Sequence, residues 1–266
     1  MQRIYFNNAA AAYPLAPGVL EAVTQSLQSY PQIPGREASD ASDSLEQCRK
    51  NMARLLSVSA CQTAFTSGAT YGLNTAILGL GLKQEDLVIA TVMEHNSVLR
   101  PLACLEDLYR VRVEHVPLEQ DIQLDENVYD KLLAQRPRLV IMTHASNVTG
   151  RINPVRLWFQ KAKSVGAATL LDASQTVGRI PVKPDELYAD MLAFPGHKGL
   201  RGPMGTGVLY VSPAIQLNPT FVGGTGVKGD VRRQPEDMPT RLEAGTPNTP
   251  AFAGLNAAVL HYMEHM

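Results

Sequence analysis

The sequence is poor in cysteine, in aromatic residues and in excess charge of either sign. Its 266 residues include three cysteines, an odd number that fits neither a disulfide framework nor a zinc site and indicates a reducing compartment. Lysine and arginine total 24 against 25 acidic residues, which argues against a nucleic-acid-binding or membrane-surface protein. No apolar run approaches the roughly 20 residues of a membrane span, and the first residues have no signal-peptide core. We therefore expect a globular protein of the cytoplasm.

Short apolar runs, rich in β-branched residues, alternate with amphipathic patterns along most of the chain. The runs predict buried strands at Thr63–Thr66, Leu87–Thr91, Val111–Val116, Leu139–Thr143, Thr169–Asp172, Met191–Phe194 and Gly207–Val211. The amphipathic patterns predict helices at Pro17–Ser29, Ser42–Leu56, Ala69–Leu80, Ser97–Tyr109, Glu126–Gln135 and Pro154–Val165. This alternation predicts an α/β fold, a three-layer sandwich with a mostly parallel, mixed seven-stranded sheet. A glycine-rich loop without a helix joins the last two strands, so we expect one of them to be antiparallel.

A long segment rich in glycine, proline and charge, residues 217–248, follows the last strand and leads to a final helix near Pro250. We interpret the segment as a functional loop, because loops of this length in compact domains are usually functional or linkers. Within it, Gly224–Gly229 matches the dinucleotide pattern G-x-G-x-x-G, which requires a strand before it and a helix after it. No helical pattern follows, so we reject a nicotinamide cofactor.

Two charged residues follow buried strands, at the sheet edge where α/β proteins bind ligands. Asp172 closes an apolar strand, and a buried carboxylate requires a cation such as a protonated ring nitrogen, unless it caps the next helix. Lys198 stands in the glycine-framed stretch Gly196–Gly199. In a partly desolvated pocket this amine would become a nucleophile able to form a Schiff base, whereas the alternative is a surface lysine on a turn. The density of glycine indicates close backbone packing and argues against the surface turn.

Three further motifs follow other strands. Ser67–Thr70 leads into a helix start whose free N–H groups suit a phosphate, although taken alone it is more typical of an ordinary helix start. His95 is suited to acid–base work, to stacking or to capping a helix, and Asn147 occupies a position usual for a turn residue. Together, an amine, a carboxylate, a ring-sized histidine and a phosphate site match what pyridoxal 5'-phosphate (PLP) requires.

Seven ordered motifs carry a resemblance to a known family: Phe6–Ala10, Phe65–Thr70, Glu94–Val98, Ser146–Gly150, Asp172–Gln175, Phe194–Lys198 and Glu243–Asn248. They resemble the class V aminotransferase superfamily, specifically its cysteine desulfurase and selenocysteine lyase branch, over essentially the whole chain. The resemblance implies that residues 17–249 form the PLP-binding large domain of fold type I. Residues 1–16 would form a segment near the active site. Residues 250–266 would begin a helix leading to a smaller C-terminal domain that is absent here.

The resemblance also implies how the cofactor ring is held. Lys198 would bind it as a Schiff base and later move the substrate Cα proton, so Lys198 and His95 are the expected catalytic residues. Asp172 would pair with the protonated pyridine nitrogen, and this charge pair keeps the ring an electron sink. His95 would stack on the ring, while Asn147 and Gln175 would hydrogen-bond near its phenolic oxygen.

Further residues are expected to hold the cofactor phosphate. Ala69 and Thr70 would bind it through backbone N–H groups and a hydroxyl, with His197 as another ligand. Thr246 would reach the phosphate of a neighbouring subunit, because relatives form active sites at a dimer interface. We therefore expect a homodimer with shared active sites, and no metal.

The resemblance implies removal of sulfur or selenium from cysteine or selenocysteine, leaving alanine, with a sulfur-acceptor protein as a further partner. In relatives, the C-terminal domain supplies the arginine for the substrate carboxylate and the cysteine that attacks sulfur; both are expected to be missing here. Cys48, Cys61 and Cys104 are predicted to be small core residues rather than nucleophiles. Two alternatives remain: another class V reaction, such as transamination or kynureninase-like cleavage, or a truncated PLP-binding protein without turnover.

Overall fold

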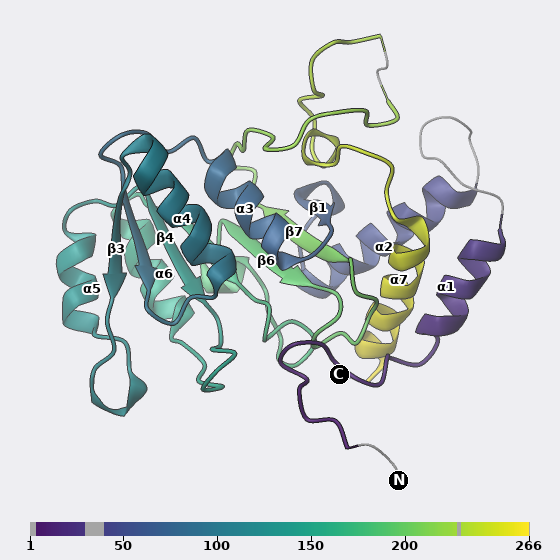
Figure 1. Cartoon of the computed structure of the whole chain (residues 1–266), viewed down its shortest axis with the longest axis horizontal. Coiled ribbons are helices and arrows are strands. Elements are labelled where there is room, and N and C mark those ends of the chain that lie inside the picture. The colour runs from purple at the N-terminus through teal and green to yellow at the C-terminus, as the bar shows by residue number, and fades with distance from the viewer. Residues whose placement is uncertain (1–3, 30–39, 228–229, 266) are drawn as a thin grey trace.

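A seven-stranded mixed sheet runs through the part of the chain that the computed structural model describes, residues 4–29, 40–227 and 230–265 (Figure 1). Its order is β1-β7-β6-β5-β4-β2-β3. The strands are β1 (Thr63–Thr66), β2 (Leu87–Thr91), β3 (Arg112–Val116), β4 (Leu139–Thr143), β5 (Ala168–Asp172), β6 (Met191–Pro195) and β7 (Gly207–Val211). Strands β3, β2, β4, β5 and β6 pair in parallel, whereas β7 is antiparallel to β6 and β1. The predicted mostly parallel sheet and its antiparallel exception are confirmed.

Helices on both faces of the sheet complete three layers. They are α1 (Val19–Gln28), α2 (Asp40–Leu56), α3 (Ala69–Gly79), α4 (Asn96–Tyr109), α5 (Glu126–Leu133), α6 (Val155–Ser164) and α7 (Thr249–Glu264). Short 3₁₀ turns lie at Ala60–Gln62, Gln120–Ile122, Asp185–Leu187 and Thr240–Leu242. One apolar cluster joins the sheet to α3 and α4, and another joins it to α2, α5, α6 and α7. The predicted α/β sandwich is thus confirmed, with helix ends shifted by a few residues.

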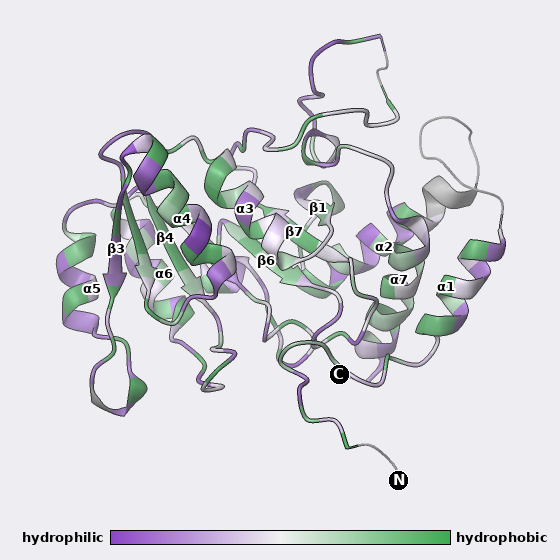
Figure 2. Cartoon of the chain, in the orientation of Figure 1, coloured by the Kyte–Doolittle hydropathy of each residue, from purple (hydrophilic) through white to green (hydrophobic). Residues whose placement is uncertain are grey.

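Strand burial follows position in the sheet. The inner strands β2, β4, β5, β6 and β7 are buried at every residue, because helices cover both of their faces. The edge strand β1 is buried as well, since α2 and α3 pack against it. The edge strand β3 exposes most of its side chains, and Figure 2 shows polar colouring on it against the green of β6 and β7. In the described part of the chain, no helix combines the length and hydrophobicity needed to cross a membrane.

The segment 217–248 forms a loop, as predicted. Its described residues hold one short 3₁₀ turn, Thr240–Leu242, before α7 begins at Thr249. The last two residues of the Gly224–Gly229 pattern lie outside the described residues. Neither a strand directly before the pattern nor a helix after it occurs in the described segments 217–227 and 230–239, so the dinucleotide interpretation lacks its required context.

Candidate active site

A cavity of about 490 Å³ opens at the carboxyl ends of the parallel strands. Eight of the nine predicted site residues line it: Ala69, Thr70, His95, Asn147, Asp172, Gln175, His197 and Lys198. They come from segments that follow β1, β2, β4, β5 and β6 in sequence, and the parallel topology brings the ends of the last four to one edge of the sheet. The N-terminal segment closes part of the cavity, since Asn7, Ala9 and Ala10 also line it.

Asp172 and Lys198 face this cavity from neighbouring parallel strands. Asp172 ends β5, is 3% exposed, and its Oδ1 accepts the N–H of Ser174 at 2.9 Å. Lys198 follows β6, where burial lowers the pKa of its amine, the Asp172 carboxylate opposes that fall and Arg179 adds to it. The turn contact that would explain Asp172 as a capping residue is therefore present, but it occupies one oxygen and leaves Asp172 in the cavity beside Lys198.

Close backbone packing accounts for the glycines near Lys198. A Cβ on Gly199 would lie 2.2 Å from the carbonyl oxygen of Val177, and one on Gly207 would lie 2.6 Å from Cα of Gly68. Both approaches exclude any larger residue. The lysine therefore sits in a tightly packed turn rather than in an open surface loop, as its glycine-rich surroundings predicted.

His95 serves as the N-cap of α4 and also lines the cavity. Its Nδ1 accepts the backbone N–H of Ser97 at 3.1 Å, so this nitrogen carries no proton and the neutral ring has its proton on Nε2. The Ser97 hydroxyl lies 2.9 Å from the same Nδ1 and 2.8 Å from the hydroxyl of Thr70. These contacts fix the orientation of the ring at the cavity, and the helix-cap alternative is confirmed alongside it.

The first turn of α3 presents free donors to the cavity. Its N-cap residue is Gly68, with φ 149°, and a glycine has no side chain that could cap the helix. Backbone N–H groups at Ala69 and Thr70 belong to this uncapped first turn, and the positive end of the helix dipole points the same way. This is an arrangement that suits a phosphate.

His197 contributes an orphaned atom to the same site. Its Nδ1 is buried and has no hydrogen-bond partner among the described residues. Burial lowers the pKa of the ring, and the charge of Lys198 adds to that effect. A buried ring nitrogen without a partner is costly, and a bound anionic or polar group would satisfy it.

Asn147 and Gln175 stand at the rim of the cavity. Asn147 is exposed, whereas Gln175 is half-buried and its Nε2 donates to the carbonyl oxygen of Ala9 at 2.9 Å. The N–H of Ala12 donates to the carbonyl oxygen of His197 at 2.8 Å. These two hydrogen bonds hold Ala9 and Ala12 of the N-terminal segment against residues that follow β5 and β6.

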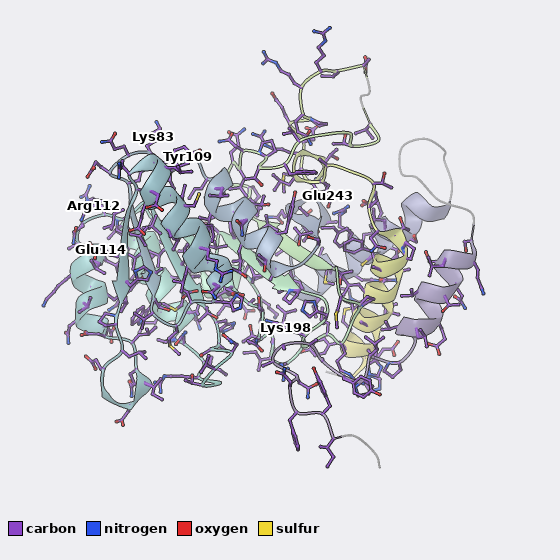
Figure 3. All side chains as sticks on the ribbon, viewed as in Figure 1. Lys83, Tyr109, Arg112, Glu114, Lys198 and Glu243 are labelled. Atoms are coloured by element: carbon purple, nitrogen blue, oxygen red, sulfur yellow. The ribbon has the colours of Figure 1, made fainter. Side chains whose placement is uncertain are left out.

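Thr246 does not line the cavity of Lys198 in this chain. It lines two neighbouring cavities instead, one of them shared with Ser67 and Tyr71, which also border the Lys198 cavity. Figure 3 shows Lys198 well separated from Glu243, which begins the Thr246 segment. The chain alone therefore does not bring Thr246 to its own site, and its expected role across a subunit interface stays a prediction.

Glu94 stands next to His95 and is a buried acidic residue to which no sequence motif gave a role of its own. Its Oε1 accepts the Thr91 hydroxyl at 2.7 Å and the Thr143 N–H at 2.9 Å, while its buried Oε2 has no partner among the described residues. Burial raises the pKa of Glu94 to about 7, and the nearby negative charge of Asp172 adds to the rise. An acidic residue at a buried strand end was the available signal, since such a group needs a cation or a proton.

The cysteines differ from expectation. Cys48 is buried, and burial raises the pKa of its thiol to about 12, which makes it an unreactive core residue as predicted. Cys61 and Cys104 are exposed, so their prediction as core residues is wrong. Cys61 lies in the 3₁₀ turn before β1, and Cys104 lies on α4, whose apolar face is formed by other residues.

Comparison with known proteins defines the class of this fold and site. The chain matches the aminotransferase class-V family over residues 4–266 and belongs to it. Members of this family depend on PLP. The Lys198–Asp172 pair, the uncapped start of α3 and the orphaned Nδ1 of His197 fit an aldehyde, a pyridine nitrogen and a phosphate.

Several relatives carry a more specific name. The chain is 33% identical to a probable cysteine desulfurase of Methanothermobacter thermautotrophicus, over 97% of this chain and 66% of the relative. It is 36% identical to a cysteine desulfurase of an Enterobacter species, over 84% and 57% respectively. Among solved structures, the apo cysteine desulfurase of Thermococcus onnurineus superposes with a TM-score of 0.91 at 32% identity, covering 98% of this chain and 67% of that one. The chain thus spans roughly three fifths to two thirds of these relatives' lengths.

Proposed function

We propose that this protein binds PLP and removes sulfur from cysteine, leaving alanine, in the manner of a cysteine desulfurase. The observation that carries the proposal is that one cavity holds Lys198 and Asp172 together with the uncapped start of α3. The cysteine desulfurase names of relatives more than 30% identical support the choice of reaction. Another solved relative, "SspA in complex with cysteine", has a TM-score of 0.84 at 28% identity, over 97% of this chain and 72% of that one.

The residues at the cavity divide the work between holding and proton transfer. Bound PLP supplies a ring that withdraws electrons from the substrate Cα. The Asp172 carboxylate would hold a positive charge opposite itself, and the amine of Lys198, whose pKa burial lowers, would carry a proton to and from Cα. His95, oriented through Nδ1, presents its ring to the cavity.

The phosphate would be held by several donors. Ala69 and Thr70 offer the first-turn N–H groups of α3, and His197 offers its buried Nδ1. Thr246 would act on the site of a second subunit, so the proposal includes a homodimer in the cytoplasm with shared active sites. Release of sulfur requires a thiolate acceptor, provided by an acceptor protein or a small thiol, and selenocysteine is included as an alternative substrate.

The proposal is tested by incubating the PLP-loaded protein with cysteine and dithiothreitol, a thiol that accepts the sulfur without any cysteine of this chain. Alanine and sulfide are expected in equal amounts, and the same assay with selenocysteine gives selenide if the substrate class is as broad as proposed. Keto-acid formation without sulfide would instead show a transaminase. A protein that, after removal of free PLP, retains no absorbance band of bound cofactor would contradict the cofactor itself.

A further inference from the structure

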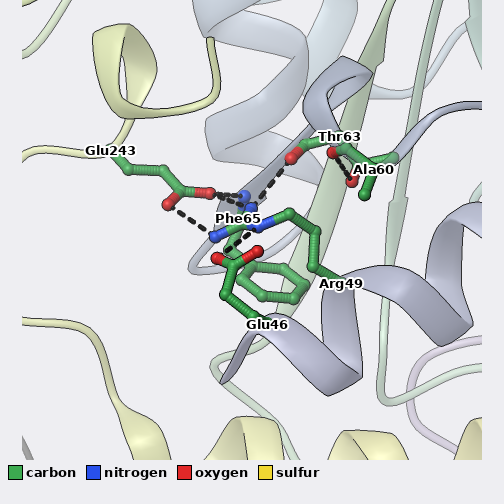
Figure 4. Close-up of polar contacts among 6 residues, drawn as sticks. All are labelled: Glu46, Arg49, Ala60, Thr63, Phe65 and Glu243. Atoms are coloured by element: carbon green, nitrogen blue, oxygen red, sulfur yellow. Dashed lines mark hydrogen bonds and ion pairs between the residues drawn. The ribbon is translucent and has the colours of Figure 1, made fainter. Parts of the chain in front are cut away.

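A buried arginine outside the lining of the Lys198 cavity joins two segments assigned to phosphate binding. Arg49, on α2, is 2% exposed and lies in a group formed with Glu46, Thr63, Phe65 and Glu243, here called the Arg49 cluster (Figure 4). Its Nη1 and Nη2 donate to the two carboxylate oxygens of Glu243 at 2.6 and 2.9 Å. Its Nε donates to Glu46 at 2.9 Å, and Nη1 also donates to the carbonyl oxygen of Thr63 at 2.8 Å. A two-pronged contact of this kind fixes both position and orientation of the carboxylate.

Glu243 also accepts a hydrogen bond from strand β1. Its Oε1 accepts the backbone N–H of Phe65 at 2.6 Å, across 178 residues of sequence. The Arg49 guanidinium lies 4.4 Å from the centre of the Phe65 ring, and that ring stacks on Phe252 of α7 at 4.2 Å. Two residues after Phe65, the chain enters the Ser67–Thr70 turn at the cavity.

Glu243 is also the first residue of the segment that carries Thr246. Within this segment the N–H of Gly245 donates to the carbonyl oxygen of Gly224 at 2.7 Å, so the long loop is tied to the same place. Ser67, Tyr71 and Thr246 line one cavity that adjoins the Lys198 cavity. The Glu243 carboxylate, held by Arg49, therefore anchors both β1, which leads into the Ser67–Thr70 turn, and the segment that carries Thr246.

We propose that Arg49 is a positioning residue, which through Glu243 holds both the Ser67–Thr70 turn for its own phosphate site and Thr246 for the site of a second copy of this chain. The inference rests on the proposed function, because it needs PLP and a dimer. It goes beyond that function by coupling the two halves of a phosphate site through a charge pair that touches no cofactor.

The electrostatics of the cluster make the arrangement dependent on both partners. Burial alone would lower the pKa of Arg49, but the carboxylates of Glu243 and Glu46 outweigh burial and raise it. In turn, burial raises the pKa of Glu243, and the charge of Arg49 opposes this rise. Removing both charges together avoids leaving one of them buried alone, so Arg49→Met/Glu243→Gln is the variant of choice.

The test is a double-mutant cycle on PLP affinity, measured from the visible absorbance of the bound cofactor during titration. Thr246→Val is expected to weaken PLP binding about tenfold in the otherwise unchanged protein, the cost of one lost hydrogen bond to a charged group. In the Arg49→Met/Glu243→Gln background the same change should cost less than about twofold, because Thr246 is no longer held in place. Thr246→Ser, which keeps the hydroxyl, should restore most of the affinity only when the Arg49 cluster is intact.

A matched control separates positioning from general stability. Lys163→Met breaks another ion pair of partial burial, that of Lys163 with Asp190 at 2.7 Å, before the start of β6 and away from the cavity. It should lower the melting temperature without changing PLP affinity or the effect of Thr246→Val. If Arg49→Met/Glu243→Gln does not fold, Arg49→Lys replaces it, since lysine keeps the charge but loses the two-pronged contact.

The outcomes are distinct. An unchanged protein that binds no PLP overturns the proposed function. An unchanged protein that binds PLP, with a Thr246→Val effect of the same size in both backgrounds, overturns the Arg49 inference alone. A Thr246→Val variant with full affinity, or a protein that remains a monomer with PLP bound, removes the role across the interface and with it the inference.

Discussion

Two glutamates, Glu94 and Glu243, differ in how their carboxyl groups are stabilised inside the protein. Glu243 keeps 21% of its side-chain exposure and receives two N–H donors of Arg49 and one of Phe65. Glu94 is 6% exposed, shares one oxygen between Thr91 and Thr143, and leaves its other oxygen without a partner among the described residues. Both help to hold strand ends, yet one does so as part of an ion pair and the other without a contacting cation.

The difference reflects what each region faces. The Arg49 cluster lies between α2, β1 and the loop before α7, where a fixed ion pair only has to hold segments together. Glu94 does not line the Lys198 cavity but bonds to Thr143, which does. The side chains of Asp172 and Lys198 line that cavity and bring their charges to it. A second permanent charge there would compete with Asp172 for the positive group, so a carboxyl whose pKa burial raises suits the position.

Lys198→Ala should have the largest effect. The charged residues at the cavity are proposed to bind a ligand rather than to stabilise the fold. We therefore expect complete loss of the visible PLP absorbance and of activity, with little change in melting temperature. The matched control is Lys183→Ala, an exposed lysine paired with Glu186, which should keep both signals. Retention of the absorbance in Lys198→Ala would show that another amine binds PLP.

Arg49→Met should produce the largest loss of stability. It leaves Glu243 beside apolar groups without its cation, and breaking a buried pair in this way costs about 3–5 kcal/mol. The measurement is urea unfolding at neutral pH. Restoration of part of that loss by adding Glu243→Gln is expected, since it removes the unpaired charge. A loss below about 1 kcal/mol would mean that the cluster behaves as a surface pair.

Glu94→Gln tests whether the Glu94 carboxyl takes up a proton on folding, which would make the stability of the protein depend on pH. The pKa of Glu94 rises from 4.5 to about 7 on folding, so between these values the folded protein holds a proton that the unfolded chain releases. Stability from this group therefore falls as pH rises through that window, by about 3 kcal/mol at most. Urea unfolding should show the variant gaining on the unchanged protein from pH 5 to pH 8. A difference that stays constant with pH would contradict the proton on Glu94.

Lys161→Met should have the smallest effect. Lys161 pairs with Glu126 and Asp130 at 2.7 and 2.8 Å, but all three side chains are at least 31% exposed. Water screens such pairs, so Lys161→Met should lower the free energy of unfolding by no more than about 1 kcal/mol. The measurement is the melting temperature, which should fall only by the corresponding small amount. A larger loss would show that burial is not what separates the Arg49 cluster from other ion pairs.

Local pattern accounted for the elements and for most of the candidate site. Apolar patterns predicted every strand to within about one residue. In strands such as Leu139–Thr143, burial on both faces leaves a continuous apolar run, whereas β3 was predicted to be buried and that prediction is wrong, because it lies at the edge of the sheet and exposes most of its side chains. Strand ends in a parallel sheet meet at one edge, so Asp172, Lys198 and His95 were expected to gather, and the cavity brings them together. Cys104 shows the limit, because an apolar residue type on a helix does not say which face it occupies.

Short-range periodicity and motif order were thus sufficient to predict the layered fold, its antiparallel exception and most residues that border the cavity. The partners of the buried charges could not be predicted in this way. Arg49 and Glu243 stand 194 positions apart, and nothing in the local pattern around either one indicates the other. Likewise, the unpartnered oxygen of Glu94 depends on which donors the two strands β2 and β4 bring to this side chain. Charge pairing is decided by three-dimensional packing because a buried charge is stabilised by whatever lies within a few ångströms, however distant in sequence.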